Sequence, residues 1–522
     1  MARAMFAAVF AALNPDPLRL RQTWLSNIPK DLVSGLVVAL ALIPEAIAFS
    51  IIAGVSPQVG LYASFSIACI TAIFGGRPAM ISAATAAVAV LFKQITAMES
   101  ITTDQALDLI FASTIIAGVF QVIAGLLRLG SLMRFVSRSV IIGFVNALAI
   151  IIFLAQVEAL LGAIDKGYGV RTWTYVFIAG ALAIIYGLPY LTKAVPSPLI
   201  AIIVLTLISL AIGGNGWTVM DEAQEKGGLP DGLPFFAMPD WAFAWQHIGL
   251  VLSVALAIAV VGLLESLMTA NIVEEATETP TERNRECMGQ GAANFITGFF
   301  GGMAGCAMIG QSIINVKSGG RTRLSTFVAG IFLLILVVFL GDIVGLIPMA
   351  ALVAVMVMVS IATFDWGSIL ALRTNPRASS VVMLATVFVT VYTHNLAIGV
   401  FTGVLLSGIF FAWKIASLFE ATRSDEDGHR TYTLEGQLFF ATVERLNEAL
   451  HFNNAPQKVT IDVFNAHIWD LTAVNALDKA ILKYRRAGAE VTLLGMNQAS
   501  KTLVAKLSEA DKPGAMERLL AH

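Results

Sequence analysis

Two acidic side chains stand alone inside long apolar stretches of this 522-residue chain. Glu45 directly follows Pro44 in the first such stretch, and Glu265 lies in a later one, at residues 262–269. A charged side chain at bilayer depth costs about 2.5 to 3.5 kcal/mol on insertion scales, so each carboxyl group needs a physical reason to be there. It either binds a cation, as a proton or through oxygen ligation of sodium, or satisfies the backbones of neighbouring helices. We favour cation binding at both, with Thr269 one helical turn beyond Glu265 on the same face.

The stretch of residues 300–323 is suited to binding an anion. It is apolar enough for a membrane, but its glycines, polar residues and Lys317 exclude a full spanning helix of about 20 apolar residues. We interpret it as a broken span, extended from Cys306 to Gly310 and helical from about Gln311. Such backbone persists in a bilayer only where protein or a water-filled cavity surrounds it. The unpaired N–H groups of the first helical turn carry partial positive charge and would stabilise an anion without a buried Lys or Arg.

Fourteen apolar segments of spanning length position these residues, between about Ile28 and Phe419. Two of them look interrupted: residues 77–87, third in the first half, and residues 300–323, third in the second half. Seven spans per half means that the two halves enter the bilayer in opposite directions. Corresponding interrupted segments in two inverted halves are typical of a transporter's substrate site near the midplane.

Composition supports a polytopic membrane protein and excludes several other classes. The chain is 57% hydrophobic and 13% charged, with a mean hydropathy of +0.80. A net charge of −2 gives nucleic-acid binding no electrostatic support. Cys69, Cys287 and Cys306 form no CxxC pair and no metal-ligand spacing with His, so we interpret them as packing residues and expect no metal centre. No nucleophile and base pair occurs at usable spacing, so we expect neither an enzyme nor a cofactor.

Cationic residues orient the spans. Cytoplasmic loops collect Lys and Arg, and an even number of spans puts both chain ends on one side. The loops on that side carry Arg77, Arg128, Arg134, Arg138, Lys193, Arg283, Arg285, Arg321, Arg323, Arg373 and Arg377, whereas the opposite side carries Lys93, Lys166, Arg171 and Lys226. Both termini are therefore expected in the cytoplasm.

The domain organisation follows from shifts in composition. We predict a cytoplasmic or interfacial segment at residues 1–27, a transmembrane domain at 28–419, a charged linker at 420–430 and a cytoplasmic α/β module at 431–522. The module alternates strand and helix patterns and has no GxGxxG or P-loop motif, so nucleotide binding has no motif to support it.

Five motifs, taken in order, resemble the sulfate permease family of anion transporters. They are DLVSG at residues 31–35, IPEAIAF at 43–49, GLYA at 60–63, ISAAT at 81–85 and GGRTR at 319–323, and they are followed by a module similar to the STAS domain. The resemblance implies seven plus seven inverted spans and a homodimer. It also implies a core domain with the first, third, eighth and tenth spans that moves against a gate domain in an elevator-like cycle. The short helices of spans three and ten then face each other across the substrate.

Two departures from the family pattern bear on the coupling ion. Many relatives have Gly-Pro where this chain has Ala86 and Ala87. Sodium-coupled bicarbonate relatives carry Asp where Glu265 stands and Thr where Ile309 stands, and they lack an acid at the position of Glu45. We therefore favour proton-coupled symport over sodium, which would be ligated at Glu265 and Thr269.

We accordingly predict a secondary active transporter of a small anion in the cell inner membrane. Sulfate, bicarbonate and C4-dicarboxylates such as fumarate fit the site, and the expected partners are that anion, bilayer lipid and a second copy of the chain. The alternatives are a sodium-coupled symporter, an uncoupled anion channel and a membrane-tethered sensor. The predicted substrate-binding residues are Phe49, Thr85, Ala86, Met308, Ile309, Gly310, Gln311 and Ser312, and the predicted cation-coupling residues are Glu45, Glu265 and Thr269.

Overall fold

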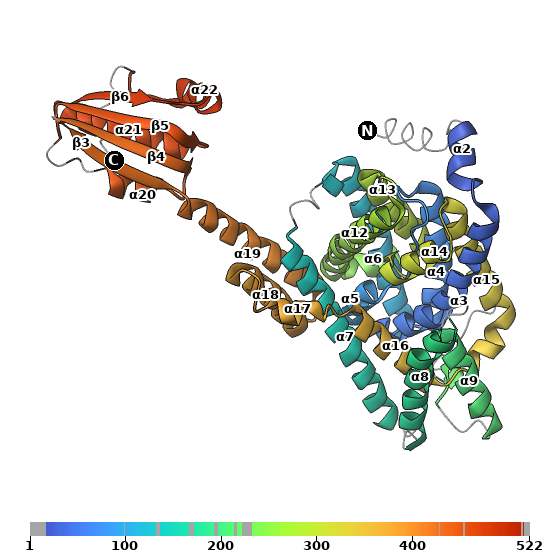
Figure 1. Cartoon of the computed structure of the whole chain (residues 1–522). Helices are drawn as coiled ribbons and strands as arrows, with labels where there is room; N and C mark the ends of the chain where they lie inside the picture. The colour runs from blue at the N-terminus through green and yellow to red at the C-terminus, as the bar shows by residue number, and fades with distance from the viewer. Residues whose placement is uncertain are drawn as a thin grey trace. The chain divides into compact units, whose positions relative to one another are not determined.

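The structure is a computed structural model whose chain divides into two compact units, Met1–Val404 and Leu405–His522 (Figure 1). It describes residues 17–98, 100–131, 136–165, 172–192, 197–212, 217–221, 232–426, 428–450, 452, 455–512 and 515. Of the predicted N-terminal segment, only the part from residue 17 is described, and it forms α2 (Pro17–Trp24). Arg134, Lys166, Arg171, Lys193 and Lys226, which contribute to the predicted orientation, lie outside the described residues.

Each of the fourteen predicted segments coincides with a helix; thirteen of these helices lie in the first unit, and α19 crosses the boundary between Val404 and Leu405. The first half contains α3 (Ile28–Ala53), α4 (Pro57–Phe74), α5 (Ala86–Thr96), α6 (Thr103–Leu126), α7 (Arg138–Asp165), α8 (Thr172–Leu191) and α9 (Ser197–Ala211). The second half contains α12 (Ile248–Thr277), α13 (Arg283–Gly298), α14 (Ile309–Lys317), α15 (Arg323–Gly345), α16 (Met349–Thr363), α18 (Arg377–Thr393) and α19 (Leu396–Ser417). The short helices α11 (Trp241–Gln246) and α17 (Gly367–Ala371) lie between them. Within the described residues, eight helices are long and apolar enough to cross a membrane, and α5, α9, α18 and the apolar part of α15 are shorter.

The packing of these helices follows the inverted repeat. The main contacts of the first helices have counterparts in the other half: α3 packs on α15 as α12 packs on α6, and α4 packs on α15 as α13 packs on α6. Likewise α3 contacts α14 and α12 contacts α5, so the half-helix of each repeat packs on the first helix of the other. In Figure 1 the blue helices α3 and α4 accordingly lie beside the yellow helices α14 and α15 of the other half. The two halves are interleaved and form one body.

Glycines allow the tightest of these contacts. A Cβ atom on Gly118 of α6 would lie 2.4 Å from the backbone nitrogen of Phe295 in α13, and one on Gly35 of α3 would lie 2.7 Å from the carbonyl oxygen of Ser325 in α15. Small residues that let helix backbones approach closely are the usual means of helix association in membranes. These contacts hold α3 and α6 firmly against the second half of the chain.

Two broken spans cross at the centre of the unit. Strands β1 (Ser82–Ala83) and β2 (Cys306–Ala307) pair antiparallel, with Ser82 opposite Ala307 and Ala83 opposite Cys306. Helix α5 begins three residues after Ala83, and α14 begins three residues after Cys306. The predicted interruption of both spans is thus present, although α14 starts at Ile309, two residues before the predicted start near Gln311.

Side chains from neighbouring helices satisfy the extended backbone. Asn294 of α13 accepts the N–H of Gly305 at 3.0 Å and donates to its carbonyl oxygen at 3.1 Å. The Ser266 hydroxyl of α12 accepts the N–H of Ala307 at 3.1 Å, and the Ser312 hydroxyl of α14 accepts the N–H of Ile81 at 2.9 Å. Because lipid offers no such partners, these bonds are what allow non-helical backbone at this depth.

The DLVSG and GGRTR motifs contact one another although about 290 residues separate them. The Asp31 carboxylate accepts the Arg321 N–H at 2.8 Å and the Thr322 hydroxyl at 2.7 Å. Asn27 donates to the Gly319 carbonyl at 2.7 Å. The start of α3 is therefore fixed to the turn that follows α14.

The second unit contains a four-stranded sheet in the order β3-β4-β5-β6. Its elements are β3 (Glu420–Glu426), β4 (His429–Leu438), α20 (Val443–Ala449), β5 (Lys458–Ile468), α21 (Leu471–Arg486), β6 (Glu490–Leu494) and α22 (Gln498–Leu507). Strands β3 and β4 are antiparallel, and the other neighbours are parallel. The structure differs from the prediction of a linker at 420–430, because these residues form β3 and the start of β4. An exposed edge strand rich in charged side chains has the same composition as a linker.

Candidate functional site

A cavity of about 420 Å³ lies where the two broken spans meet. Its lining comes from α3, α5, α12 and α14, and from α7, α9 and α16. Nine predicted site residues line it together: Glu45, Phe49, Thr85, Ala86, Glu265, Met308, Ile309, Gly310 and Gln311. The described lining includes no Lys or Arg, and Glu45 and Glu265 are its titratable members.

Two further predicted residues lie behind the cavity wall. Ser312 is fully buried, and its hydroxyl accepts the Ile81 N–H. The Thr269 hydroxyl donates to the backbone carbonyl of Glu265, one turn earlier, at 2.8 Å. Ser312 therefore supports the backbone of the first broken span, and Thr269 directs its hydroxyl at the backbone rather than at the Glu265 carboxylate.

The starts of α5 and α14 both face the cavity. Neither capping residue, Thr85 or Met308, accepts a side-chain hydrogen bond from its own helix. The first helical backbone hydrogen bonds run from the Ala89 N–H to the Thr85 carbonyl oxygen at 2.9 Å and from the Ser312 N–H to the Met308 carbonyl oxygen at 3.1 Å. The N–H groups ahead of them form the positive end of each helix, where an anion is stabilised. Nothing lies within 4 Å of a Cβ built on Gly310, so there is open space beside the start of α14.

Each carboxylate is connected to one of these helix starts. Glu45 of α3 accepts a hydrogen bond from the Gln311 amide, in the first turn of α14. Glu265 of α12 accepts one from the Cys306 thiol at 2.9 Å, and the Cys306 sulfur lies 3.1 Å from the Thr85 hydroxyl oxygen at the start of α5. Changes at either carboxylate can thus reach the backbone donors through one or two side chains.

Sequence reasoning missed Cys306, which it treated as a packing residue. A lone cysteine has no spacing pattern that could identify its partners. The available signal was its position at the start of the stretch predicted to be extended, since a side chain there must lie beside the two helix starts. The described residues contain no group of three or more His, Cys, Asp and Glu side chains able to hold a metal ion.

The cavity extends toward one end of the unit. Beyond the helix starts, its lining continues to Pro198 and Leu199 in the first turn of α9, and to Ala362 and Thr363 in the last turn of α16. In the predicted topology this is the end with the cationic loops.

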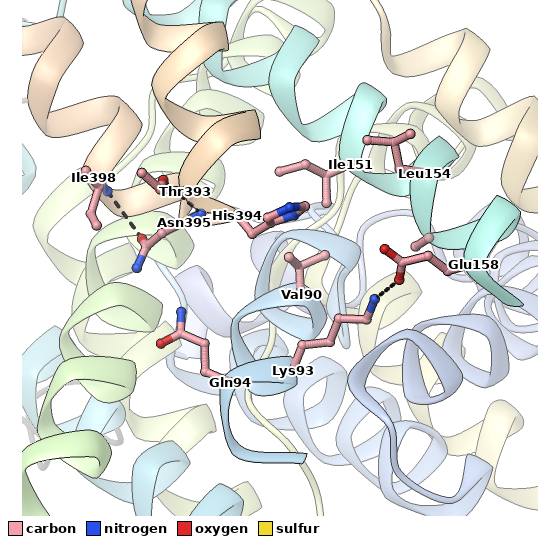
Figure 2. A pocket seen from close by; sticks show the side chains of 11 residues that line it. Val90, Lys93, Gln94, Ile151, Leu154, Glu158, Thr393, His394, Asn395 and Ile398 are labelled. Carbon is pink, nitrogen blue, oxygen red and sulfur yellow. Dashed lines mark hydrogen bonds and ion pairs between the residues drawn. The ribbon is translucent and has the colours of Figure 1, made fainter. Parts of the chain in front are cut away.

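A second cavity of about 430 Å³ lies at the opposite end, near the end of α5, beside residues 151–158 of α7, and where α18 gives way to α19 (Figure 2). Lys93 of α5 and Glu158 of α7 reach toward each other and form an ion pair. His394 caps α18 with a left-handed backbone (φ 51°), and its exposed ring lies on the wall of this cavity. The ion pair joins a helix of the predicted core to a helix of the predicted gate.

The comparisons with known proteins decide the family. Residues 28–386 match the model of the sulfate permease family, and residues 421–517 match that of the STAS domain. The chain belongs to the sulfate permease family. YbaR of Bacillus subtilis (strain 168), which carries the name of a sulfate transporter, is 50% identical over 490 residues, covering 94% of this chain and 99% of YbaR. The bicarbonate transporter BicA of Picosynechococcus sp. is 26% identical over 75% of this chain and 71% of its own.

Solved structures agree with this assignment. The transmembrane domain of a cyanobacterial BicA superposes with a TM-score of 0.64 at 26% identity, over 72% of this chain and 97% of that one. SLC26A9 superposes with a TM-score of 0.79 at 18% identity, over 99% of this chain and 91% of its own, which shows the shared fold. Membership of the family makes the chain a multi-pass membrane transporter of anions and not an enzyme, and confirms the predicted fold class.

Proposed function

We propose that the chain is a secondary active transporter that holds a small anion between the starts of α5 and α14. The observation that carries this proposal is the meeting of two uncapped helix starts at one cavity, with open space beside Gly310. Sulfate, bicarbonate and a C4-dicarboxylate such as fumarate are the candidate substrates, because each offers oxygens to backbone N–H donors. The names of YbaR and BicA point to the first two.

Electrostatics favour coupling to a cation. An anion that enters a cavity lined by Glu45 and Glu265, with no Lys or Arg in the described lining, is repelled while both carboxylates are ionised. Uptake of protons or of a cation removes that repulsion. We favour protons, because the Thr269 hydroxyl points to a backbone carbonyl and the side chain of Ile309 offers no oxygen ligand to sodium. Sodium-coupled symport and an uncoupled channel are the alternatives.

The same proposal includes a transport cycle and a location. Helices α3, α5, α12 and α14 would form the core that moves against α7, α9 and α16, in a transport domain of residues 28–419. We place both termini and the module of residues 431–522 in the cytoplasm, the chain in the cell inner membrane, and two copies in a dimer. Cysteine accessibility at the termini of intact cells and crosslinking in membranes would test the location and the dimer.

Uptake into proteoliposomes tests the function. Labelled sulfate, bicarbonate, fumarate and succinate are offered at two pH values, with and without sodium. We expect accumulation of at least one anion against its gradient, driven by an inward proton gradient and abolished by Glu45→Gln or Glu265→Gln. Glu274→Gln is the matched control, since Glu274 lies further along α12 and pairs with Arg283 at 3.4 Å, outside the cavity.

Other outcomes would replace the proposal. Passive equilibration unaffected by either cavity substitution favours a channel, and accumulation that requires sodium but no proton gradient favours the sodium symporter. A chain truncated after Phe419 that still transports excludes a role limited to sensing.

A further inference from the structure

A chain of three hydrogen-bonding side chains leads from Glu265 to the start of α5. The Cys306 sulfur lies 2.9 Å from Glu265 Oε2 and 3.1 Å from Thr85 Oγ1, so it is shared between them. Glu265 lies on α12, Cys306 lies on β2, and Thr85 is the N-cap residue of α5. Cys306 is fully buried and Thr85 is 2% exposed. Water therefore has little access to the thiol, whose hydrogen-bond partners are Glu265 and Thr85.

The direction of the hydrogen bonds among these three side chains depends on whether Glu265 is protonated. An ionised carboxylate only accepts hydrogen bonds, so beside it the Cys306 S–H points to Glu265 and the sulfur accepts the Thr85 hydroxyl hydrogen. A protonated Glu265 donates from Oε2 to the sulfur instead. The thiol hydrogen is then free to turn to the Thr85 oxygen, and the Thr85 hydroxyl hydrogen is free to turn into the cavity.

We propose that Cys306 is a positioning residue that transmits protonation of Glu265 to Thr85, so that uptake of one proton turns a hydroxyl donor toward the transported anion. This inference rests on the proposed function of the cavity. The one covalent bond formed is O–H on Glu265, with a proton taken from the aqueous cavity. The thiol and hydroxyl hydrogens only rotate about their C–S and C–O bonds.

The consequence is a direct link between proton and anion binding. With Glu265 ionised, Thr85 presents an oxygen lone pair to the anion at the start of α5. With Glu265 protonated, it presents a donor. A hydrogen bond to a charged group is strong enough to change affinity by about tenfold. Because binding linkage is reciprocal, the anion raises the affinity of the site for the proton by the same factor.

Other titratable groups do not share this position. Glu45 is the other carboxylate that lines the cavity, and it is bonded to Gln311 rather than to Cys306. The remaining described groups on α12 or its two caps and on the elements packed against it lie outside the cavity lining; they are Lys93, Asp104, Asp108, His247, Glu274, Glu275, Glu278, Arg283, Arg285, Glu286, Cys287 and Lys317. A pH response that depends on Cys306 therefore reports on Glu265.

Binding of labelled sulfate and fumarate to the purified full chain, measured from pH 5 to 8, tests the relay. We expect wild-type affinity to rise by more than about tenfold as the pH falls, with about tenfold from the Thr85 donor and the rest from relief of carboxylate repulsion. Cys306→Ser keeps a group that both donates and accepts and should retain this change. Cys306→Ala should still bind and keep the part of the response due to carboxylate repulsion, but lose the roughly tenfold part due to the Thr85 donor, and Thr85→Val should lose the same part.

The control is Cys69→Ala, which removes another buried thiol, 3.9 Å from the Phe327 carbonyl and outside the cavity lining. It should leave the pH profile unchanged. The relay is overturned if Cys306→Ala binds with the full wild-type pH dependence, or if Cys306→Ser loses it while its melting temperature matches the wild type. Failure of the wild type to bind either anion at any pH would instead remove the proposed function and the relay with it.

Discussion

Gly310 allows the anion site to be blocked without disturbing the fold. A Cβ atom on Gly310 would meet nothing within 4 Å, and its backbone is not in the left-handed region, so Ala fits without strain, and Val extends two methyl groups from the same open position on the cavity lining. Helix propensity favours Ala over Gly by up to about 1 kcal/mol. The new methyl groups would occupy the space beside the first N–H groups of α14. Loss of even one hydrogen bond to a charged ligand costs about 1.5 to 3 kcal/mol, so we expect Gly310→Val to weaken anion binding by roughly tenfold to a hundredfold.

Anion binding and thermal unfolding, measured on the same detergent-solubilised samples, check this prediction. Gly310→Ala should have an intermediate affinity, and both variants should melt at or above the wild-type temperature. Gly305→Ala is the contrasting substitution, because its Cβ would lie 2.0 Å from the Ala83 carbonyl oxygen where β1 and β2 pair. Overpacking of that kind costs about 1 to 3 kcal/mol or more, so it should lower the melting temperature. Wild-type affinity in a stable Gly310→Val protein would show that the anion does not bind at the start of α14.

Two further predictions concern charges outside the central cavity. The Lys93–Glu158 pair is about half exposed at both ends and worth up to about 1 kcal/mol, so reversing either charge should change the transport rate by no more than about fivefold, and exchanging the two should restore it. If the effects of the two single reversals on uptake simply add in the double exchange, Lys93 and Glu158 do not interact between α5 and α7. In the second unit, hydrogen bonds from Arg423 and then Arg430 lower the pKa of Asp425 to about 2. Because the folded pKa lies below the ordinary value of about 3.9, the stabilisation is complete above about pH 4 and is lost as the pH falls through about 2. Hydrogen exchange of β3 and β4 should therefore be constant from pH 8 to 5, after correction for intrinsic rates, and Asp425→Asn should raise it over that range; equal exchange in both proteins would contradict the reasoning.

The sequence predicts those parts of the fold that depend on whether a segment is surrounded by lipid or by water. Hydropathy gives the spans because lipid excludes uncompensated polar groups, and the same rule identified the breaks before Ala86 and Ile309. The family resemblance implied that the helices carrying Glu45 and Glu265 lie beside the two broken spans, but no sequence pattern paired Glu45 with Gln311 or Glu265 with Cys306. Sequence spacing does not report which side chain meets which across about 266 residues of chain.

What sequence could not predict depends on particular partners. Cys306 has two neighbours that come from different helices, and neither is signalled by its position in the chain. The strand β3 was missed because its charged residues suit an edge strand and a linker equally well. The second cavity is lined by the end of α5, a stretch of α7 and the turn between α18 and α19, and hydropathy does not indicate that these segments meet.

The inverted repeat equates the two carboxylates by position, but their connections differ in chemistry. Glu45 of the first half is bonded to α14 of the second, and Glu265 of the second half is linked to α5 of the first. An amide such as Gln311 changes from donor to acceptor only by turning its whole head group, which moves heavy atoms against their packing. A thiol makes the same change by rotating one hydrogen. Of the two equivalent positions, the one at Glu265 is therefore better able to convert proton uptake into a change at the anion site, whereas Glu45 is better suited to holding the start of α14 in place.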